Sequence, residues 1–243
     1  MLIANIARHF IRKPFCRNRY INQYGLPHRC QQIIAVVAME IGKPLGRKMR
    51  GRPRQFDRQE ALETALALFQ VRGYEGTSIA DLTDAIGVSA TSLYGAFQSK
   101  EALFEEAVAL YQQRDGAFAA AALERPGTTH EAIRNLLGEA AKRYAINGQP
   151  GGCFIALGLL SCGPDHQAIA QRMTARRIAA RDAIKARLDR GISQGELPAT
   201  TDTAALAAFY AATLQGLSVQ ARDGASERDL RAIADLALIP LQT

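Results

Sequence analysis

One short region of this sequence gathers side chains that are suited to recognising nucleic acid. At its centre are four small residues, three of which carry hydroxyl groups: Ser89, Ala90, Thr91 and Ser92. A helix that carries such small polar side chains can approach base edges closely. Tyr94 follows in the same expected helix and Lys100 opens the next one, so a phenol and an ammonium are placed to contact phosphates.

Arginines stand just before this region. Arg50, Arg52 and Arg54 alternate with a glycine and a proline, and Arg58 follows shortly afterwards. An extended, narrow Arg-Gly-Arg-Pro segment can lie in an A·T-rich minor groove, where its guanidinium groups meet a strong negative potential. The segment is similar to the core of an AT-hook, although pentamers of this kind also arise by chance in solvated tails.

The net charge of +7 does not carry this argument, because the charge is unevenly distributed. Residues 1–48 hold nine Lys or Arg and one acidic residue, so the rest of the chain is close to neutral. Residues 1–48 show no sustained helical or strand period. They are a basic arm that adds nonspecific DNA affinity, an organelle-type targeting segment, or an upstream mis-start before a true start at Met49. We favour the third interpretation.

Helical periodicity indicates the elements that position these side chains. A helix is expected from Arg58 to Arg72, with apolar residues at i, i+3, i+4 and i+7 and with Asp57 as its N-cap. A second, short helix is expected to follow an N-cap at Thr77. It should end at Gly87, because the left-handed conformation that closes a helix costs glycine least.

The next helix should begin at the N-cap Ser89 and bury Leu93 and Phe97, with Tyr94 on the opposite side. Two short helices joined by a glycine turn form the helix-turn-helix pattern, whose second helix enters the DNA major groove. The same pattern also occurs in plain helical bundles. Together with the polar and basic side chains, it predicts a DNA-binding motif at about residues 78–97.

Six short motifs follow one another through residues 51–112: an Ala- and Leu-rich helix, then Gly-Tyr, Thr-Ser, Gly-Val-Ser, Leu-Tyr-x-x-Phe and Ser-Lys-Glu-Ala-Leu. This stretch resembles the N-terminal domain of the TetR/AcrR family of bacterial transcriptional regulators. The resemblance implies that Thr77 and Lys100 contact phosphates and that residues 89–92 and Tyr94 lie on the recognition helix. Many members have a basic or aromatic residue where this chain has Gly95 or Ala96. We therefore expect fewer phosphate contacts from this helix, with the arginines upstream compensating.

The fold class predicted for the whole chain is all-α. Residues 49–105 should form the three-helix DNA-binding domain and residues 106–243 a helical effector-binding and dimerisation domain. The expected helices after the motif are Ser99 to about Ala121, an amphipathic helix through Ile133 to Tyr144, a fully buried helix at 153–163, a long helix from Pro164 to about Arg190, and a final pair at about 204–222 and 226–241. The long helix should bury the stripe Ile169, Met173, Ala180, Ile184 and Leu188, and its Arg-rich face is most simply solvated.

Two sites are expected in the second domain. A mainly apolar small molecule should bind among its helices, near Cys153, Phe154, Leu157, Met173 and Phe209. The resemblance implies that the last two helices meet a twofold copy through an interface with Leu206, Tyr210, Leu214, Leu217, Leu230, Ile233 and Ala237. The alternative is that these helices only complete the monomer core.

No Ser, His and Asp arrangement indicates a catalytic site, so we expect neither an enzyme nor a cofactor. Cys153 and Cys162 are either sensors of thiol-reactive compounds or small buried hydrophobes. Asp165 and His166 stand close to Cys162 as conceivable metal ligands, but we expect no metal site. No apolar run approaches the ~20 residues that span a bilayer, so a cytoplasmic protein without a membrane partner is expected.

These observations predict a ligand-responsive, homodimeric repressor. It should bind a palindromic operator in double-stranded DNA and be released by a small apolar effector. Two alternatives stay open. One is a thiol- or electrophile-sensing regulator that acts through Cys153 and Cys162, and the other is a helical small-molecule-binding protein without a role at DNA.

Overall fold

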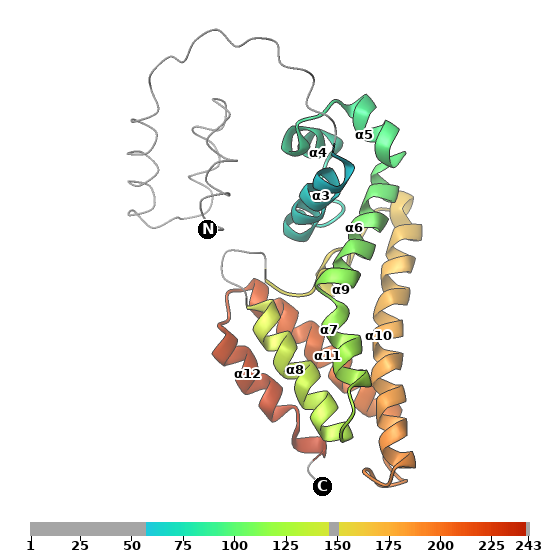
Figure 1. The fold of residues 1–243 in the computed structure, drawn as a ribbon, viewed down its shortest axis with the longest axis vertical. Coiled ribbons are helices and arrows are strands. Elements are labelled where there is room, and N and C mark those ends of the chain that lie inside the picture. The colour runs from blue at the N-terminus through green and yellow to red at the C-terminus, as the bar shows by residue number, and fades with distance from the viewer. Residues whose placement is uncertain (1–56, 146–150, 242–243) are drawn as a thin grey trace, which may run out of the picture. The chain divides into compact units, whose positions relative to one another are not determined.

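The computed structural model describes residues 57–145 and 151–241, and in these ranges all regular secondary structure is helical (Figure 1). The elements are, in order, α3 (Arg58–Arg72), α4 (Ile79–Ile86), α5 (Ala90–Phe97), α6 (Lys100–Arg114), α7 (Ala117–Glu124), α8 (Thr129–Tyr144), α9 (Phe154–Leu157), the 3-10 turn η1 (Pro164–His166), α10 (Gln167–Ser193), α11 (Thr203–Arg222), α12 (Glu227–Leu236) and the 3-10 turn η2 (Ile239–Leu241). The all-α prediction is confirmed. Residues 1–48 and the arginines Arg50, Arg52 and Arg54 lie outside the described residues.

Local capping determines where the first helices begin and end. Asp57 accepts two backbone N–H hydrogen bonds at the start of α3, and Gly73 ends that helix at φ 69°. Gly87 ends α4 in the left-handed conformation, at φ 80° and ψ 35°. Ser89 then caps α5 by accepting a hydrogen bond from the backbone of Ser92. The predicted helix-turn-helix is therefore confirmed, with its glycine turn in place.

The N-cap of α4 differs from the prediction by one residue. Ser78, and not Thr77, caps the helix: its Oγ accepts from the backbone N–H of Asp81 at 3.1 Å. The Asp81 carboxylate accepts in turn from the backbone N–H of Ser78 at 2.9 Å, which completes a capping box. Thr77 is unavailable for capping because its hydroxyl donates to the Gly73 carbonyl at 2.8 Å.

The helix-turn-helix shares one apolar core with the C-terminal half of the chain. Its centre consists of Phe69, Leu82, Leu93, Phe97, Leu103 and Phe104, from α3, α4, α5 and α6. Phe154 of α9 and Ile169 and Met173 of α10 belong to the same buried cluster. The Phe104 ring meets the Phe69 ring edge to face at 5.0 Å and the Phe154 ring at 5.5 Å. The helix-turn-helix therefore depends on residues of the C-terminal half for its packing.

The helix predicted from Ser99 to about Ala121 is interrupted. Asp115 and Gly116 separate α6 from α7, and both of their backbone N–H groups donate to the Tyr111 carbonyl, at 2.8 and 2.9 Å. A Cβ at Gly116 would lie 3.2 Å from the Cα of Gln112, a tight contact that any other residue could make only if the backbone shifted slightly. Periodicity alone did not reveal this break, because apolar residues continue on both sides of it.

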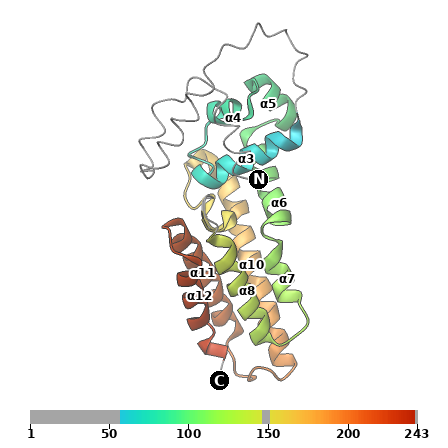
Figure 2. The same ribbon diagram turned by 60° about the vertical axis from the view of Figure 1, so that its left-hand side comes forward.

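The helix α8 lies at the centre of the C-terminal half, beside α7, α10, α11 and α12 (Figure 2). Its predicted apolar face is buried: Ile133, Leu136, Leu137, Ala140 and Tyr144. A second buried cluster forms where this face meets Ile184 and Leu188 of α10 and Tyr210 of α11. The amphipathic helix is thus confirmed, and it provides the core of this half.

The long helix α10 corrects two expectations. Ala180 of the predicted buried stripe is exposed. On the face expected to be solvated, Arg187 is only 2% exposed. Its guanidinium donates to the Thr129 hydroxyl at 3.0 Å and to the Gly127 carbonyl at 2.6 Å, so it holds the turn that precedes α8. A buried arginine persists here because polar groups of that turn accept its hydrogen bonds.

The segment 151–163, which we call the connecting segment, is not the buried helix that was predicted. Only the four residues of α9 are helical, and Leu160 is 67% exposed. Its backbone is satisfied by distant partners instead. Arg177 of α10 donates to the carbonyls of Ile155 and Leu159, at 3.3 and 3.4 Å. The Gly158 carbonyl accepts from the backbone N–H of Tyr74 at 3.1 Å, so the segment joins α10 to the turn between α3 and α4.

Candidate nucleic-acid interface

The outward face of α5 carries the side chains predicted to read DNA. Leu93 and Phe97 are each 2% exposed and anchor the helix in the core. The opposite side is exposed at Ala90, Thr91, Ser92 and Tyr94, and Tyr94 is 44% exposed. The hydroxyls of Ser89 and Ser92 lie 2.9 Å apart within the cap. Thr91 and Tyr94 are therefore the larger side chains that this helix presents to an approaching duplex.

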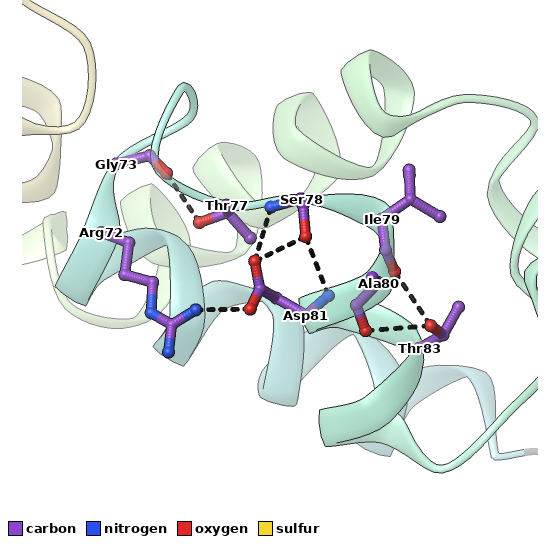
Figure 3. Close-up of polar contacts among 8 residues, drawn as sticks. All are labelled: Arg72, Gly73, Thr77, Ser78, Ile79, Ala80, Asp81 and Thr83. Carbon is purple, nitrogen blue, oxygen red and sulfur yellow. Dashed lines mark hydrogen bonds and ion pairs between the residues drawn. The ribbon is translucent and has the colours of Figure 1, made fainter. Parts of the chain in front are cut away.

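Thr77, which directly precedes the N-cap of α4, turns its hydroxyl into the protein. Figure 3 shows its hydroxyl turned toward the Gly73 carbonyl, and the residue is fully buried. The phosphate contact that the resemblance implies for Thr77 stays a prediction, and it requires this hydroxyl to leave the Gly73 carbonyl. Ser78 is exposed in its place, at the N-terminus of α4, where backbone N–H groups favour an anion.

Asp81 organises this helix start, and the sequence prediction overlooked it. Its carboxylate accepts from the Ser78 hydroxyl at 2.6 Å and from Arg72 Nη1 at 2.7 Å (Figure 3). The hydrogen bonds from Ser78, followed by the charge and hydrogen bond of Arg72, lower the pKa of Asp81 to about 2. The Ser-x-x-Asp spacing of residues 78–81 is a capping-box signal that could have revealed this pair.

Lys100 begins α6 after the N-cap Ser99, as predicted. Its ammonium lies over the Tyr74 ring, 4.1 Å from the centroid, and the side chain is half-buried. Burial lowers the pKa of Lys100, against the smaller opposing effect of Glu75 and Asp81. A phosphate contact from this lysine stays a prediction, and it requires the ammonium to reach past the ring.

Arg58 is one of the basic residues upstream of the motif, but its guanidinium is engaged within the protein. It lies 4.6 Å from the centre of the Phe97 ring and donates to the Ala96 carbonyl at 3.3 Å. It also donates to the Glu106 carboxylate at 2.7 Å. One side chain of α3 therefore contacts both α5 and α6, and its role is to hold the motif together.

The five residues of the predicted effector pocket do not gather in one place. Phe154 and Met173 are buried in the core shared with the helix-turn-helix, and Cys153 packs against its edge. Phe209 is 42% exposed on α11 and lies outside that cluster. Leu157 is half-buried. Phe209 therefore lies apart from the buried members of the predicted set, because helical periodicity does not determine which face of α11 turns inward.

Cys153 is half-buried and lies beside two tyrosines, Tyr111 and Tyr144. Burial raises the pKa of Tyr111 and of Tyr144, and the neighbouring Cys153 adds to both shifts. Cys162 is half-buried beside the core shared with the helix-turn-helix. Neither thiol is paired in a disulfide. In the ranges that the structure describes, His, Cys, Asp and Glu form no group suited to a metal ion.

The predicted dimer-interface residues divide into two groups. Tyr210, Leu217, Leu230 and Ala237 are buried in the chain's own core, so they cannot meet a second copy. Leu206 and Leu214 are half-buried, and Ile233 is exposed. Exposed apolar side chains that the prediction missed lie on the same two helices and just beyond them: Phe209, Val219, Leu236 and Ile239.

Comparisons with known proteins agree with this geometry. A family model described as bacterial regulatory proteins, tetR family, matches residues 61–107, and a tetracyclin repressor-like C-terminal domain matches residues 129–235. The chain is 35% identical over 193 residues to the HTH-type transcriptional repressor ComR of Escherichia coli (strain K12), which covers 79% of this chain and 92% of ComR. It is 33% identical over 190 residues to the repressor BdcR of the same strain, covering 78% and 91% of the two chains.

A solved structure of a regulator of the same family is also similar to this chain. The TetR family transcriptional regulator CifR, a cysteine mutant complexed with 26 bp double-strand operator DNA, is 41% identical with a TM-score of 0.73. The match covers 77% of this chain and 98% of that one. Among the described helices, none combines the length and apolar character that a membrane span needs.

Proposed function

The chain belongs to the TetR family of bacterial regulatory proteins, and we propose that it is a homodimeric repressor that a small, mainly apolar effector releases from a palindromic operator. The observation that carries this proposal is the outward face of α5, where Thr91 and Tyr94 are exposed above the buried anchors Leu93 and Phe97. The named relatives ComR and BdcR are repressors, and the CifR structure contains operator DNA. Such a protein acts in the bacterial cytoplasm, and it regulates rather than catalyses.

Dimerisation supplies the geometry of operator recognition. Two α5 helices related by twofold symmetry read half-sites one duplex turn apart, at a spacing of roughly 34–36 Å. Exposed Phe209 and Val219 of α11, with Ile233 and Leu236 of α12, support a twofold contact through this helix pair. An effector that prefers a different spacing of the two α5 helices weakens DNA binding, typically by ~1–3 kcal/mol of coupling.

The core between α8, α10 and α11 is the effector site that we favour. Within 57–145 and 151–241, Tyr210 Oη, Arg187 Nε and His130 Nε2 are buried without a hydrogen-bond partner. Burial raises the pKa of Tyr210 to about 12, so its hydroxyl keeps a proton to donate. A largely apolar ligand needs only a few such polar contacts to fix its orientation. We therefore propose an effector with an apolar body and an oxygen that accepts a hydrogen bond from Tyr210 Oη.

Selection of bound sequences from random DNA tests the function, and the protein should enrich a near-palindrome. Tyr94→Ala should weaken binding to the enriched sequence by about 1 kcal/mol, the usual net value of a hydrogen bond. Tyr94→Phe should weaken it equally if the hydroxyl makes the contact, and the Phe variant is therefore the matched control. Enrichment of no sequence would contradict a role at DNA.

Apolar compounds are then screened for release of the protein from the selected operator. If no class of compound releases it, the proposed apolar effector is rejected.

A further inference from the structure

Three helix ends converge at the start of the connecting segment. α3 ends at Arg72, α8 at Tyr144 and α11 at Arg222. Gly151 lies against two of these ends, because a Cβ built on it would be 2.5 Å from the Ala221 carbonyl oxygen and 3.0 Å from that of Tyr144. The last carbonyls of a helix lack partners within it and carry a partial negative charge. A cation at this position is therefore favoured.

The guanidinium of Arg222 occupies this position. Its Nη2 donates to the Gln70 carbonyl at 3.0 Å and its Nη1 to the Val71 carbonyl at 3.3 Å, both in the last turn of α3. Its Nε donates to the Gly151 carbonyl at 3.1 Å. The planar fork of an arginine suits several acceptors at once, which the single ammonium of a lysine does not. The final residue of α11 is thus hydrogen-bonded to the end of α3.

We infer that Arg222 is a positioning residue for operator binding, which fixes the orientation of the helix-turn-helix relative to the dimer helix α11. This inference rests on the proposed function. α11 carries Phe209 and Val219 of the proposed twofold contact, and α3 is joined to α5 through Arg58. The Arg222 side chain of α11 is hydrogen-bonded directly to α3. The angle at which each subunit presents its α5 helix, and so the match to two half-sites, depends on this side chain.

A second attachment keeps the fold intact without Arg222. The Tyr74 backbone N–H donates to the Gly158 carbonyl at 3.1 Å, and the Glu75 carboxylate accepts from the Gly163 N–H at 3.1 Å. These contacts hold the turn after α3 to the connecting segment. Removing the Arg222 side chain therefore loosens one side of the junction, and the shared core is unaffected.

The test compares Arg222→Gln with Arg181→Gln in the full-length protein. Both changes remove one exposed positive charge, but Arg181 pairs only locally, with Asp182 at 3.1 Å. Arg222→Gln should weaken operator binding about tenfold, within the usual range of coupling between sites, and Arg181→Gln less than about twofold. The dependence of affinity on salt should stay unchanged in both, because neither residue contacts a phosphate. Arg222→Lys should recover only part of the affinity.

Three results would overturn the inference. The first is equal operator affinity of Arg222→Gln and Arg181→Gln. The second is a reduced salt dependence of Arg222→Gln, which would make the residue a direct phosphate contact. The third is a monomeric Arg222→Gln protein, which would place it in the dimer contact. If Arg222→Gln does not fold, full affinity of Arg222→Lys decides against the inference. If the unmodified protein selects no DNA sequence, the proposed function fails first, and the two failures remain distinct.

Discussion

At the scale of single residues, Asp81 links the end of α3 to the start of α4. Its carboxylate receives the Ser78 hydroxyl and backbone N–H and the Arg72 guanidinium, at 2.6, 2.9 and 2.7 Å. These contacts favour the ionised form, which explains a pKa of about 2. Because α4 supports the recognition helix through the shared core, protonation of this one group weakens the frame of the motif.

Replacing Asp81 by Asn should lower the free energy of unfolding by about 1 kcal/mol at pH 7, the usual value of a helix cap. The pKa of Asp81 is lower in the folded chain than the ordinary value of 3.8, so its stabilisation is present above about pH 4. It is lost as the pH falls from about 4 to about 2, and the two proteins should become equally stable there. Urea denaturation across this pH range, at one protein concentration, measures the difference. Asp165→Asn, at an exposed carboxylate, is the control, and a gap that persists at the lowest pH would contradict the assignment.

At the scale of elements, two glycines of the helix-turn-helix serve opposite purposes. Gly87 adopts φ 80° between α4 and α5, a conformation that other residues rarely accept. Gly95 lies inside α5, with an ordinary helical backbone. A Cβ would meet nothing within 4 Å at either position. Substitution by alanine therefore tests backbone conformation alone, free of steric conflict.

Gly87→Ala should destabilise the protein by about 1 kcal/mol, because a left-handed conformation is costly for an L-residue. Gly95→Ala should stabilise it by about 1 kcal/mol, because alanine favours a helix interior over glycine. The same chemical change thus has opposite signs at two sites eight residues apart. Thermal unfolding of both variants measures this. Stabilisation by Gly87→Ala would mean that the turn has another conformation.

The elements were largely predictable from the sequence, and the reasons are local. Asp57 and Ser89 begin helices through side-chain hydrogen bonds, and Gly73 and Gly87 end helices through their backbone freedom. Periodicity indicates the buried face of α8. Exposure depends on tertiary packing, which no local pattern contains. The connecting segment is apolar enough for a buried helix, yet its carbonyls bond to Arg177 and to the turn after α3.

The candidate sites were predictable to different degrees, because each depends to a different extent on tertiary packing. α5 has few neighbours, so its inner and outer faces follow from Leu93 and Phe97 alone. α11 is apolar on most sides, and the sequence could not distinguish the buried Tyr210 from the exposed Phe209 beside it. Arg222 lies 152 residues after its acceptor Gln70 and 151 residues after its acceptor Val71, so no sequence pattern indicates these contacts.

At the scale of the whole molecule, α11 and α12 carry exposed apolar side chains, and this is the surface that we propose for a second copy. Leu236 is 67% exposed, and Ile233 and Phe209 are also exposed. Exposed groups of this kind mark association sites when they lie together. Leu214 is half-buried in the chain's own core, so a charge there would disturb folding as well as association.

Leu236→Glu should convert the dimer to monomers, because a carboxylate buried in an apolar contact loses its hydration. Leu160→Glu is the matched control: it makes the same change at a leucine that is also 67% exposed, but in the connecting segment. Sedimentation equilibrium of both variants gives their masses. A dimeric Leu236→Glu protein, or a monomeric Leu160→Glu protein, would show that the subunits meet elsewhere.

The contacts of Arg58 limit how a signal can alter DNA recognition. Sliding α5 against α3 would separate this guanidinium from the Phe97 ring and the Ala96 carbonyl, and the Glu106 carboxylate holds α6 to the same side chain. Ligand binding in the C-terminal half should therefore tilt α3, α4 and α5 together, as one rigid group. The side chains of α5 that face the DNA bases should keep their arrangement. Each subunit then keeps its preferred half-site, and only the preferred distance between half-sites changes. Mutations in the two halves of the chain can accordingly change operator spacing and operator sequence independently of each other.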